Sequence, residues 1–295
     1  MQRSNACLRI SKFEDYELID ASCGEKLERF GDIILIRPDP QIIWNTPKVD
    51  PMWRKAHAKY IRSTKGGGYW EVYKKIPDVW TISYKDLKFR LKPMGFKHTG
   101  IFPEQAVNWD FVSDVVSKSS GNMKILNLFA YTGGATMAAL SAGAEVCHVD
   151  ASKGMTLWAK ENVKESGLQD KSVRFIVDDC LKFVQREKRR NHFYDAIIMD
   201  PPSYGRGPNG EVWKLEEGIF NLLNACSEIL SENARFFILN SYTAGLSCGV
   251  MAYLLNATIA KNRSGVVFSS EIGLPLKASK LVLPCGSTSI WQASI

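Results

Sequence analysis

Beyond residue 124, short apolar runs alternate with longer amphipathic segments. The apolar runs predict strands at Ile125–Ala130, Glu145–Val149, Val173–Val177, Ala196–Met199 and Phe236–Leu239. The amphipathic segments predict helices at Gly134–Ala142, Lys153–Ser166, Cys180–Lys188, Leu215–Leu230 and Gly249–Ala260. A further helix is expected to begin at Pro103 and to end near Ser117. Strands that alternate with helices form a parallel sheet covered on both faces, which binds ligands where its strands end.

The first part of the chain has a different pattern, in which turn residues separate short strands. Aromatic and β-branched runs predict strands at Tyr16–Ile19, Asp32–Ile36, Ile42–Trp44, Tyr69–Tyr73, Trp80–Tyr84 and Leu87–Leu91. The last two of these strands predict a hairpin, and residues 53–62 predict one short helix. We therefore expect an α/β protein with a smaller, β-rich N-terminal domain at residues 1–97 and a larger domain at residues 98–295.

The composition is typical of a folded, soluble protein. The 295 residues are 45% hydrophobic and 23% charged, which excludes a disordered chain. Apolar runs are too short to span a bilayer and none follows the N-terminus, so we expect neither a membrane association nor a secretory signal. Seven scattered cysteines without C-x-x-C spacing and four dispersed histidines predict no disulfide framework, no metal site and a cytoplasmic location.

Positive charge is concentrated in one segment of the N-terminal domain. The whole chain carries a net charge of +7, whereas residues 53–97 contain twelve basic and three acidic residues, or +9. Nine aromatic residues are interleaved with them. Such a segment suits a nucleic acid whose phosphates and bases are both contacted. Alternatively, the aromatic residues form the core of a small β-domain and the lysines keep it in solution.

Four predicted strands end in residues suited to ligand binding. After the first, Gly133 and Gly134 permit a sharp turn and a close backbone approach beside the amides of a helix start. The second ends at Asp150, whose carboxylate could accept hydrogen bonds from both hydroxyls of a ribose. The third is followed by Asp178-Asp-Cys180, where a carboxylate could accept from an adenine amino group. The fourth ends in Asp200-Pro-Pro-Ser-Tyr204, where two prolines stiffen the backbone.

Each feature alone has a purely structural interpretation. Two glycines often form only a turn, an acidic residue after a strand often caps a helix, and Asp-Pro-Pro can be a rigid loop. The succession of all four at consecutive strand ends favours a binding site. Because the dinucleotide fingerprint G-x-G-x-x-G is absent, a dehydrogenase is disfavoured.

This ordered set resembles the class I S-adenosylmethionine-dependent methyltransferases. Among them it is most similar to the bacterial 23S ribosomal RNA methyltransferases of the cytosine-C5 and guanine-N7 type. The resemblance extends from Lys97 to the C-terminus. Its motifs are Lys97-His-Thr-Gly-Ile-Phe-Pro-Glu-Gln105, Asn127-Leu-Phe-Ala-Tyr-Thr-Gly-Gly134, Asp150-Ala-Ser152, Asp178-Asp-Cys180, Asp200-Pro-Pro-Ser-Tyr204 and Leu283-Pro-Cys-Gly286.

The resemblance implies a Rossmann-like, seven-stranded sheet with S-adenosylmethionine across the ends of its first strands. Within the site, the Tyr131–Gly134 turn would hold the methionine part, Asp150 the ribose, and Asp179 with Cys180 the adenine. The catalytic loop would be formed by Asp200, Pro201, Pro202 and Tyr204, with Tyr204 as a stacking surface for the acceptor base. The cofactor-binding residues implied are Phe102, Gln105, Phe129, Tyr131, Thr132, Gly133, Gly134, Asp150, Ala151, Ser152, Asp179, Cys180 and Asp200.

One departure from the family pattern indicates which atom of the base accepts the methyl group. Relatives that methylate cytosine C5 carry a cysteine just after the fifth strand, where this chain reads Asn240-Ser-Tyr-Thr-Ala-Gly245. Carbon methylation needs a thiolate that adds to the base, whereas a nitrogen acceptor needs only orientation. We therefore expect an enzyme that methylates a purine nitrogen in RNA, most simply ribosomal RNA, contacted through residues 53–97. Cytosine C5, with Cys248 or Cys180 as nucleophile, stays open as an alternative.

Two further alternatives come from other classes of function. The chain could methylate a protein or a small molecule, with its N-terminal domain conferring specificity. It could instead be an RNA-binding protein that keeps the cofactor fold only as a scaffold. The sequence leaves the nucleotide, the RNA and the oligomeric state undecided.

Overall fold

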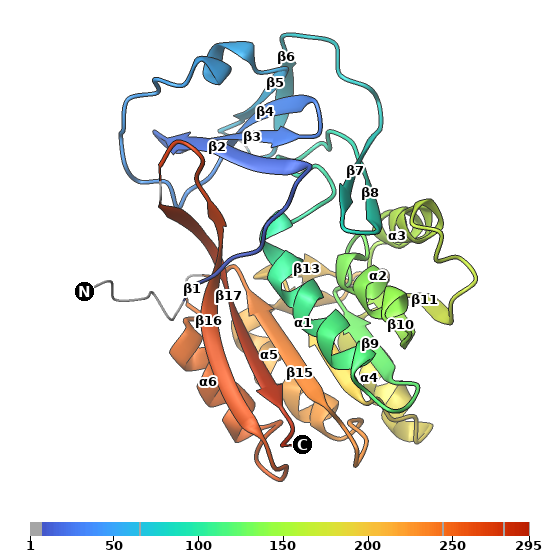
Figure 1. Ribbon diagram of the computed structural model, residues 1–295. Helices are drawn as coiled ribbons and strands as arrows, with labels where there is room; N and C mark the ends of the chain where they lie inside the picture. Colours follow the sequence, from blue (N-terminus) through green and yellow to red (C-terminus); the bar gives the residue numbers. More distant parts are fainter. Residues whose placement is uncertain (1–7, 65, 244, 280, 295) are drawn as a thin grey trace. The chain divides into compact units, whose positions relative to one another are not determined.

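The computed structural model describes residues 8–64, 66–243, 245–279 and 281–294, which form two compact units (Figure 1). The larger unit contains Asn108–Ile272, the residues from Gly286 onward and those up to Arg9. The smaller unit contains Ile10–Val107 and Gly273–Cys285.

A mostly parallel sheet forms the centre of the larger unit, with the strand order β1-β16-β17-β15-β12-β9-β10-β11 (Figure 1). Strand β9 pairs in parallel with both β10 and β12, whereas β17 runs antiparallel to β15. The strands are β1 (Leu8–Arg9), β9 (Lys124–Leu128), β10 (Glu145–Asp150), β11 (Val173–Val177), β12 (Ala196–Met199), β15 (Phe236–Ser241), β16 (Val266–Pro275) and β17 (Val282–Gln292).

The α/β, Rossmann-like fold class is confirmed, and the five strands expected beyond residue 124 are present. The sheet has eight strands instead of seven. The additional strand is β1, which pairs in parallel with Glu271 and Ile272 of β16. A two-residue strand without apolar alternation leaves no pattern that could have predicted it.

Helices cover both faces of this sheet (Figure 1). Helices α4, α5 and α6 pack in succession on one face, and α2 packs against α3 and β10 on the other. A short hairpin of β13 (Tyr204–Arg206) and β14 (Val212–Lys214) precedes α5. The helices are α1 (Ala106–Ser117), α2 (Gly134–Ser141), α3 (Lys153–Glu165), α4 (Cys180–Arg189), α5 (Leu215–Ser227) and α6 (Cys248–Ala257).

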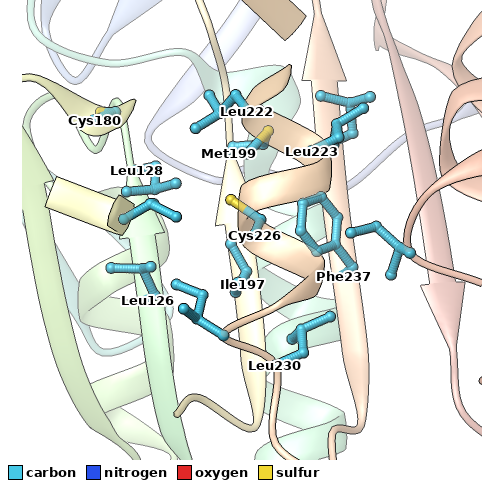
Figure 2. Packing of buried hydrophobic residues seen from close by; sticks show 14 of the residues in the cluster. Leu126, Leu128, Cys180, Ile197, Met199, Leu222, Leu223, Cys226, Leu230 and Phe237 are labelled. Atoms are coloured by element: carbon cyan, nitrogen blue, oxygen red, sulfur yellow. The ribbon is translucent and has the colours of Figure 1, made fainter. Parts of the chain in front are cut away.

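The core of the larger unit lies between the sheet and helices α4 to α6. Figure 2 shows Leu126 and Leu128 of β9, Met199 of β12 and Phe237 of β15 together with Cys226 of α5. These side chains are almost fully buried, and burial of a side chain the size of leucine contributes about 1.5–3 kcal/mol. This packing holds the carboxyl ends of the central strands in fixed positions.

The smaller unit contains a five-stranded sheet in the order β2-β3-β4-β5-β6 and a separate hairpin, β7-β8. Neighbouring strands are antiparallel except β4 and β5, which are parallel. Its elements are β2 (Tyr16–Ser22), β3 (Glu25–Phe30), β4 (Ile33–Pro38), the 3₁₀ turn η1 (Pro51–Lys55), β5 (Ala58–Arg62), β6 (Gly68–Val72), β7 (Trp80–Tyr84), β8 (Leu87–Leu91) and the 3₁₀ turn η2 (Pro103–Gln105).

Two predicted elements of the smaller unit are wrong. Residues 53–62 do not form one helix, because the turn η1, capped by Asp50, ends at Lys55 and strand β5 follows with Ala58 and Tyr60 buried. Residues 42–44 form no strand, although they hydrogen-bond to the β2–β3 turn through Ile42 O and Trp44 O.

Strand β3 was not expected because it is rich in charged residues. One of them, Glu28, is fully buried and accepts two hydrogen bonds of 2.7 Å from Arg37 of β4. A buried charge of this kind requires its partner from another strand, which the local sequence does not reveal.

The expected boundary after residue 97 differs from the division in the structure. Backbone hydrogen bonds from Lys92 to Thr99 and from Met94 to His98 join the next ten residues to the smaller unit. The segment Gly273–Cys285 also belongs to this unit, because Lys277 N donates to Leu18 O of β2 at 3.0 Å. Such pairing joins residues far apart in the chain and leaves no local signal.

Within the described part of the chain, no helix has the length and apolar character needed to cross a bilayer. Residues 1–7, which include Cys7 and the N-terminus where no secretory signal was expected, lie outside the described residues.

Candidate active site

The order of strands reverses at β9, which has β10 on one side and β12 on the other. The carboxyl ends of these strands therefore form a topological switch point, where open α/β sheets bind their ligands. Three of the four expected motifs follow β9, β10 and β12 directly, and the fourth follows the neighbouring strand β11. The structure thus brings together motifs that are up to 70 residues apart in the chain.

The turn after β9, residues 129–134, has an unusual backbone. Phe129, Tyr131 and Gly133 have positive φ angles of 53°, 51° and 89°. For the two aromatic residues this conformation is unfavourable and needs support from the surroundings, a situation that is common at binding sites. Asn162 of α3 gives this support, because its side-chain amide donates to Thr132 O at 2.9 Å.

Gly133 and Gly134 are required by close packing. A Cβ on Gly133 would lie 3.1 Å from Ala159 Cβ of α3, in a left-handed backbone conformation. A Cβ on Gly134 would lie 2.6 Å from a ring carbon of Trp109 in α1. The turn is therefore held tightly against both helices, and the N-terminus of α2 begins directly behind it, with unpaired amides suited to a negatively charged group.

Asp150 ends β10 and is joined to the same turn. One carboxylate oxygen accepts from Tyr131 N at 2.9 Å and the other from Ser152 N at 2.8 Å. Burial raises the pKa of Asp150, and these two hydrogen bonds act in the opposite direction. Because a carboxylate offers about four acceptor positions, two remain for the hydroxyls of a ligand.

The neighbouring Ala151 and Ser152 connect Asp150 to α3. Ser152 is the N-cap of this helix, and its hydroxyl accepts from Met155 N at 3.3 Å. Its side chain therefore serves the helix start, which is the structural interpretation of an acid or hydroxyl after a strand. Ala151 is half-buried between the two.

The turn after β11 contains two acidic residues with different surroundings. Asp178 forms an ion pair with Arg186, while Asp179 caps α4 by accepting from Lys182 N at 2.9 Å through one oxygen. Cys180 is the first residue of α4 and is buried, and this burial raises the pKa of its thiol well above the usual value. Asp178 N donates to Asp150 O at 3.2 Å, which joins this turn to β10.

The loop after β12 contains the expected catalytic residues. Asp200 is half-buried, Pro201 is buried and Pro202 is exposed. Tyr204, the first residue of β13, is 53% exposed and therefore accessible to a stacking partner. The loop is tied at its end by Leu215 N, the start of α5, which donates to Ser203 O at 3.0 Å.

Phe102 and Gln105 belong to the smaller unit, where they flank and end the turn η2. The ring of Phe102 lies 5.3 Å from that of His98. Their approach to the cofactor stays a prediction.

The structure adds residues that the sequence analysis did not select. Asn162 supports the turn after β9, and a buried chain of Asn127, Thr136 and His148 lies behind it, with 3.0 Å between successive polar atoms. Trp213 of β14 donates from its indole to Pro202 O at 2.7 Å. Each of these contacts joins separate elements, so spacing in the sequence could not have indicated them. Among the described residues, no group of three or more His, Cys, Asp and Glu side chains could hold a metal ion.

A family model described as S-adenosylmethionine-dependent methyltransferase matches residues 66–249, which is more than half of the chain. The chain belongs to this family. The crystal structure of a SAM-dependent methyltransferase from Agrobacterium tumefaciens is 37% identical and has a TM-score of 0.93, with 97% of this chain and 93% of that chain covered. A putative methyltransferase complexed with SAH, at 19% identity, has the same fold with a TM-score of 0.74, covering 95% of this chain and 76% of that one.

Curated relatives named ribosomal RNA large subunit methyltransferase K/L are also similar. The protein from Shewanella oneidensis is 29% identical over 242 residues, which are 79% of this chain and 32% of that protein. The protein from Shewanella baltica strain OS155 is 31% identical over 156 residues, which are 52% of this chain and 21% of that protein. The chain thus spans about a fifth to a third of the length of these relatives.

This methyltransferase uses S-adenosylmethionine, and the site residues fit that cofactor. The turn after β9 leads directly into the N-terminus of α2, and Asp150 retains acceptor positions on both oxygens. A cofactor with a ribose and an amino-acid part needs two such features, a charged acceptor for the hydroxyls and backbone amides at a helix N-terminus for a carboxylate.

Replacing Asp150 by alanine should weaken S-adenosylmethionine binding by about 1–3 kcal/mol, because it removes a charged acceptor for two hydroxyls. Isothermal titration calorimetry with S-adenosylmethionine and S-adenosylhomocysteine measures this. Asp150→Asn should lose less, since one oxygen remains. Asp170→Ala, in an exposed loop before β11, is the matched control. Equal affinities for Asp150→Ala and the control would contradict the role of Asp150.

Proposed function

We propose that this methyltransferase transfers a methyl group to a base in RNA, and that its substrate is ribosomal RNA. The observation that carries the proposal is the similarity to relatives named ribosomal RNA large subunit methyltransferase K/L. The basic smaller unit supports it, since phosphate contacts dominate the affinity of proteins for nucleic acids. The reaction takes place in the cytoplasm, where ribosomal RNA is found.

We assign the cofactor contacts to the residues that the strand ends carry. Asp150 holds the ribose, the Tyr131–Gly134 turn with Phe129 holds the methionine part, and Asp179 with the backbone of Cys180 holds the adenine. S-adenosylmethionine supplies a methyl group activated by its positively charged sulfur. Ala151 and Ser152 set the direction of Asp150, and Phe102 and Gln105 are assigned to the cofactor as well.

The loop Asp200–Tyr204 holds the acceptor base. Asp200 accepts hydrogen bonds from the base, the rigid backbone of Pro201 and Pro202 keeps it in place, and Tyr204 stacks on its ring. Support comes from the position of the loop at the switch point and from the exposure of Tyr204. Transfer to a nitrogen then depends on alignment of its lone pair with the methyl carbon.

The environment of the cysteines supports a purine nitrogen as acceptor. Burial raises the pKa of Cys147 to about 11, and it also raises the pKa values of Cys180, Cys226 and Cys285. These thiols stay protonated at neutral pH and are poor nucleophiles. Among the described cysteines of the larger unit, Cys248, half-buried at the start of α6, is the thiol that a cytosine-C5 reaction would need, since Cys147, Cys180 and Cys226 are buried.

The RNA contact lies in the smaller unit. Strand β8 alternates buried apolar residues with basic ones, so that Lys88 and Arg90 lie on one face, followed by the exposed Lys92. The aromatic side chains in the segment 53–97 include both buried and exposed ones. Tyr60, Tyr84 and Phe89 are buried in the core, while Tyr69, Tyr73 and Phe96 are 60%, 51% and 62% exposed and available to bases.

Replacing Lys85, Lys88, Arg90 and Lys92 together by alanine should lower RNA affinity and flatten its dependence on salt, by roughly one unit of slope for each lost phosphate contact. Filter binding at several salt concentrations measures this, and cofactor affinity should stay unchanged. The matched control replaces exposed lysines of the larger unit, Lys118, Lys171 and Lys261. An unchanged salt slope would mean that these basic residues serve solubility instead.

Methyl transfer from labelled S-adenosylmethionine to total RNA tests the function. The RNA comes from a strain in which the gene has been deleted, and the modified nucleoside is identified by mass spectrometry. A methylated purine in ribosomal RNA is expected, with Cys180→Ser and Cys248→Ser each retaining most activity. A covalent adduct with RNA containing 5-fluorocytosine, lost in Cys248→Ser, would show that cytosine C5 is the acceptor. If the label were found in protein or in small molecules and not in RNA, the proposal of an RNA substrate would be rejected.

A further inference from the structure

Trp213, the central residue of β14, contacts both loops of the site in the larger unit. Its indole Nε1 donates to Pro202 O at 2.7 Å. Its ring also lies against Phe129, the first residue of the cofactor turn, with 5.3 Å between centroids and 49° between the ring planes. One side chain thus joins the loop after β12 to the turn after β9.

The ring of Trp213 has little freedom to move. A Cβ on Gly218 of α5 would lie 2.6 Å from Trp213 Cζ3, so the indole fills the space that this glycine leaves. In the β13–β14 hairpin Trp213 pairs with Gly205, where a Cβ would lie 3.5 Å from Pro202 Cγ. Gly218 therefore allows the indole to approach α5 closely, while Gly205 lies at ordinary contact distance from Pro202.

The hairpin that carries Trp213 is itself anchored. At its tip, Glu211 forms an ion pair of 2.5 Å with Lys182 of α4 and accepts from Asn209 N at 2.9 Å. At its base, Leu215 N donates to Ser203 O at 3.0 Å. The hairpin is therefore attached to α4 at one end and to α5 at the other, with Trp213 between them.

Pro201 and Pro202 stiffen the loop after β12 but lack backbone N–H groups, so hydrogen bonds from other elements fix where this rigid loop lies. A loop with two missing donors makes fewer hydrogen bonds of its own. The hydrogen bond from the Trp213 indole to Pro202 O therefore contributes more to holding this loop in position. Because the Trp213 ring also contacts Phe129, the position of Pro202 is coupled to that of the cofactor turn. A displacement of about 1 Å between reacting groups can lower a rate by about 100-fold.

We propose that Trp213 is a positioning residue that sets the distance between the acceptor loop and the cofactor turn. This role rests on the proposed function of the Asp200–Tyr204 loop. The two contacts of the side chain have separate consequences. The hydrogen bond to Pro202 O orients the acceptor and affects kcat, whereas the ring contact with Phe129 supports the cofactor turn and affects the KM for S-adenosylmethionine.

The substitution Trp213→Phe separates these consequences, because it keeps a ring and removes the indole donor. It should lower kcat about tenfold and change the KM for S-adenosylmethionine less than about twofold. Trp213→Ala should change both, and its affinity for S-adenosylhomocysteine should fall in calorimetry. Gly218→Ala, which pushes on the ring from behind, should resemble Trp213→Ala if it displaces the indole. The matched control is Trp44→Phe, which removes an indole–carbonyl bond of 2.7 Å to Ala21 O in the smaller unit.

Hydrogen exchange tests the same attachment without RNA. Amides of residues 203–207 should exchange faster in Trp213→Phe than in the wild type or in Trp44→Phe, with unchanged exchange in β10 and α3. If the wild type methylates no RNA, the proposed function fails, and this measurement still decides the role of Trp213. Unchanged exchange in Trp213→Phe, or a kcat equal to that of Trp44→Phe, would overturn the inference.

Discussion

Replacing Asp200 by alanine should lower kcat for RNA methylation by about 100-fold or more, with the affinity for S-adenosylmethionine largely retained. The reason is the position of Asp200 directly after β12, where buried residues of the sheet hold the backbone and Pro201 is itself buried. In the role proposed for Asp200, loss of the carboxylate removes the hydrogen-bond partner of the acceptor base without altering the Asp150 side of the site.

Steady-state kinetics with the RNA identified above measures this effect, and calorimetry with S-adenosylhomocysteine measures the cofactor site separately. Asp200→Asn is the informative companion, since it keeps the shape and one oxygen and should recover part of kcat. Asp195→Asn is unsuitable as a control because Asp195 accepts from Lys124 N at the start of β9. A kcat within a few-fold of the wild type for Asp200→Ala would contradict the catalytic assignment.

The second large effect concerns acid stability. His148 of β10 is fully buried, and burial, with a smaller contribution from Lys160, lowers its pKa to about 3. Above pH 6.5 the imidazole is neutral in both the folded and the unfolded chain. Between pH 6.5 and pH 3 only the unfolded chain takes up the proton, so the free energy of unfolding should fall as the pH falls, by about 1.4 kcal/mol per pH unit.

The variant His148→Gln should lack this component. The free energy of unfolding of the wild type should therefore fall by about 2 kcal/mol more than that of the variant when the pH is lowered from 6.5 to 5. Urea unfolding at several pH values measures the difference. Thr136→Val removes the hydroxyl 3.0 Å from His148 Nδ1 but keeps the titrating group, so its curve should run parallel to the wild type. Parallel curves for His148→Gln as well would contradict a low pKa in the folded state.

Local patterns were sufficient wherever one element follows another directly. Apolar runs predicted the five strands β9, β10, β11, β12 and β15 of the larger unit, and the residues after four of them marked Gly133, Asp150, Asp179 and Asp200. In parallel sheets the strand ends lie together, so the sequence order of these motifs already implied a common site. The roles of these residues remain proposals, while the fold, the family and the cofactor are confirmed.

The same local patterns were insufficient where a charged or mixed segment depends on a distant partner. Strand β3 is stabilised by the pairing of Glu28 with Arg37, and β1 by its pairing with β16. The expected helix at residues 53–62 failed because the apolar residues of β5 are buried by neighbouring strands, which override a weak helical preference.

The sequence by itself therefore determined the alternation of strands and helices between residues 124 and 241, the methyltransferase motifs and the concentration of charge in residues 53–97. Only the tertiary structure decided which aromatic residues of that segment are exposed, and which side chains support the site from other elements. Asn162 reaches Thr132 across 30 residues, and Trp213 reaches Phe129 from strand β14. The physical reason is that a motif is set by neighbours along the chain, whereas burial and hydrogen-bond partners are set by packing between elements.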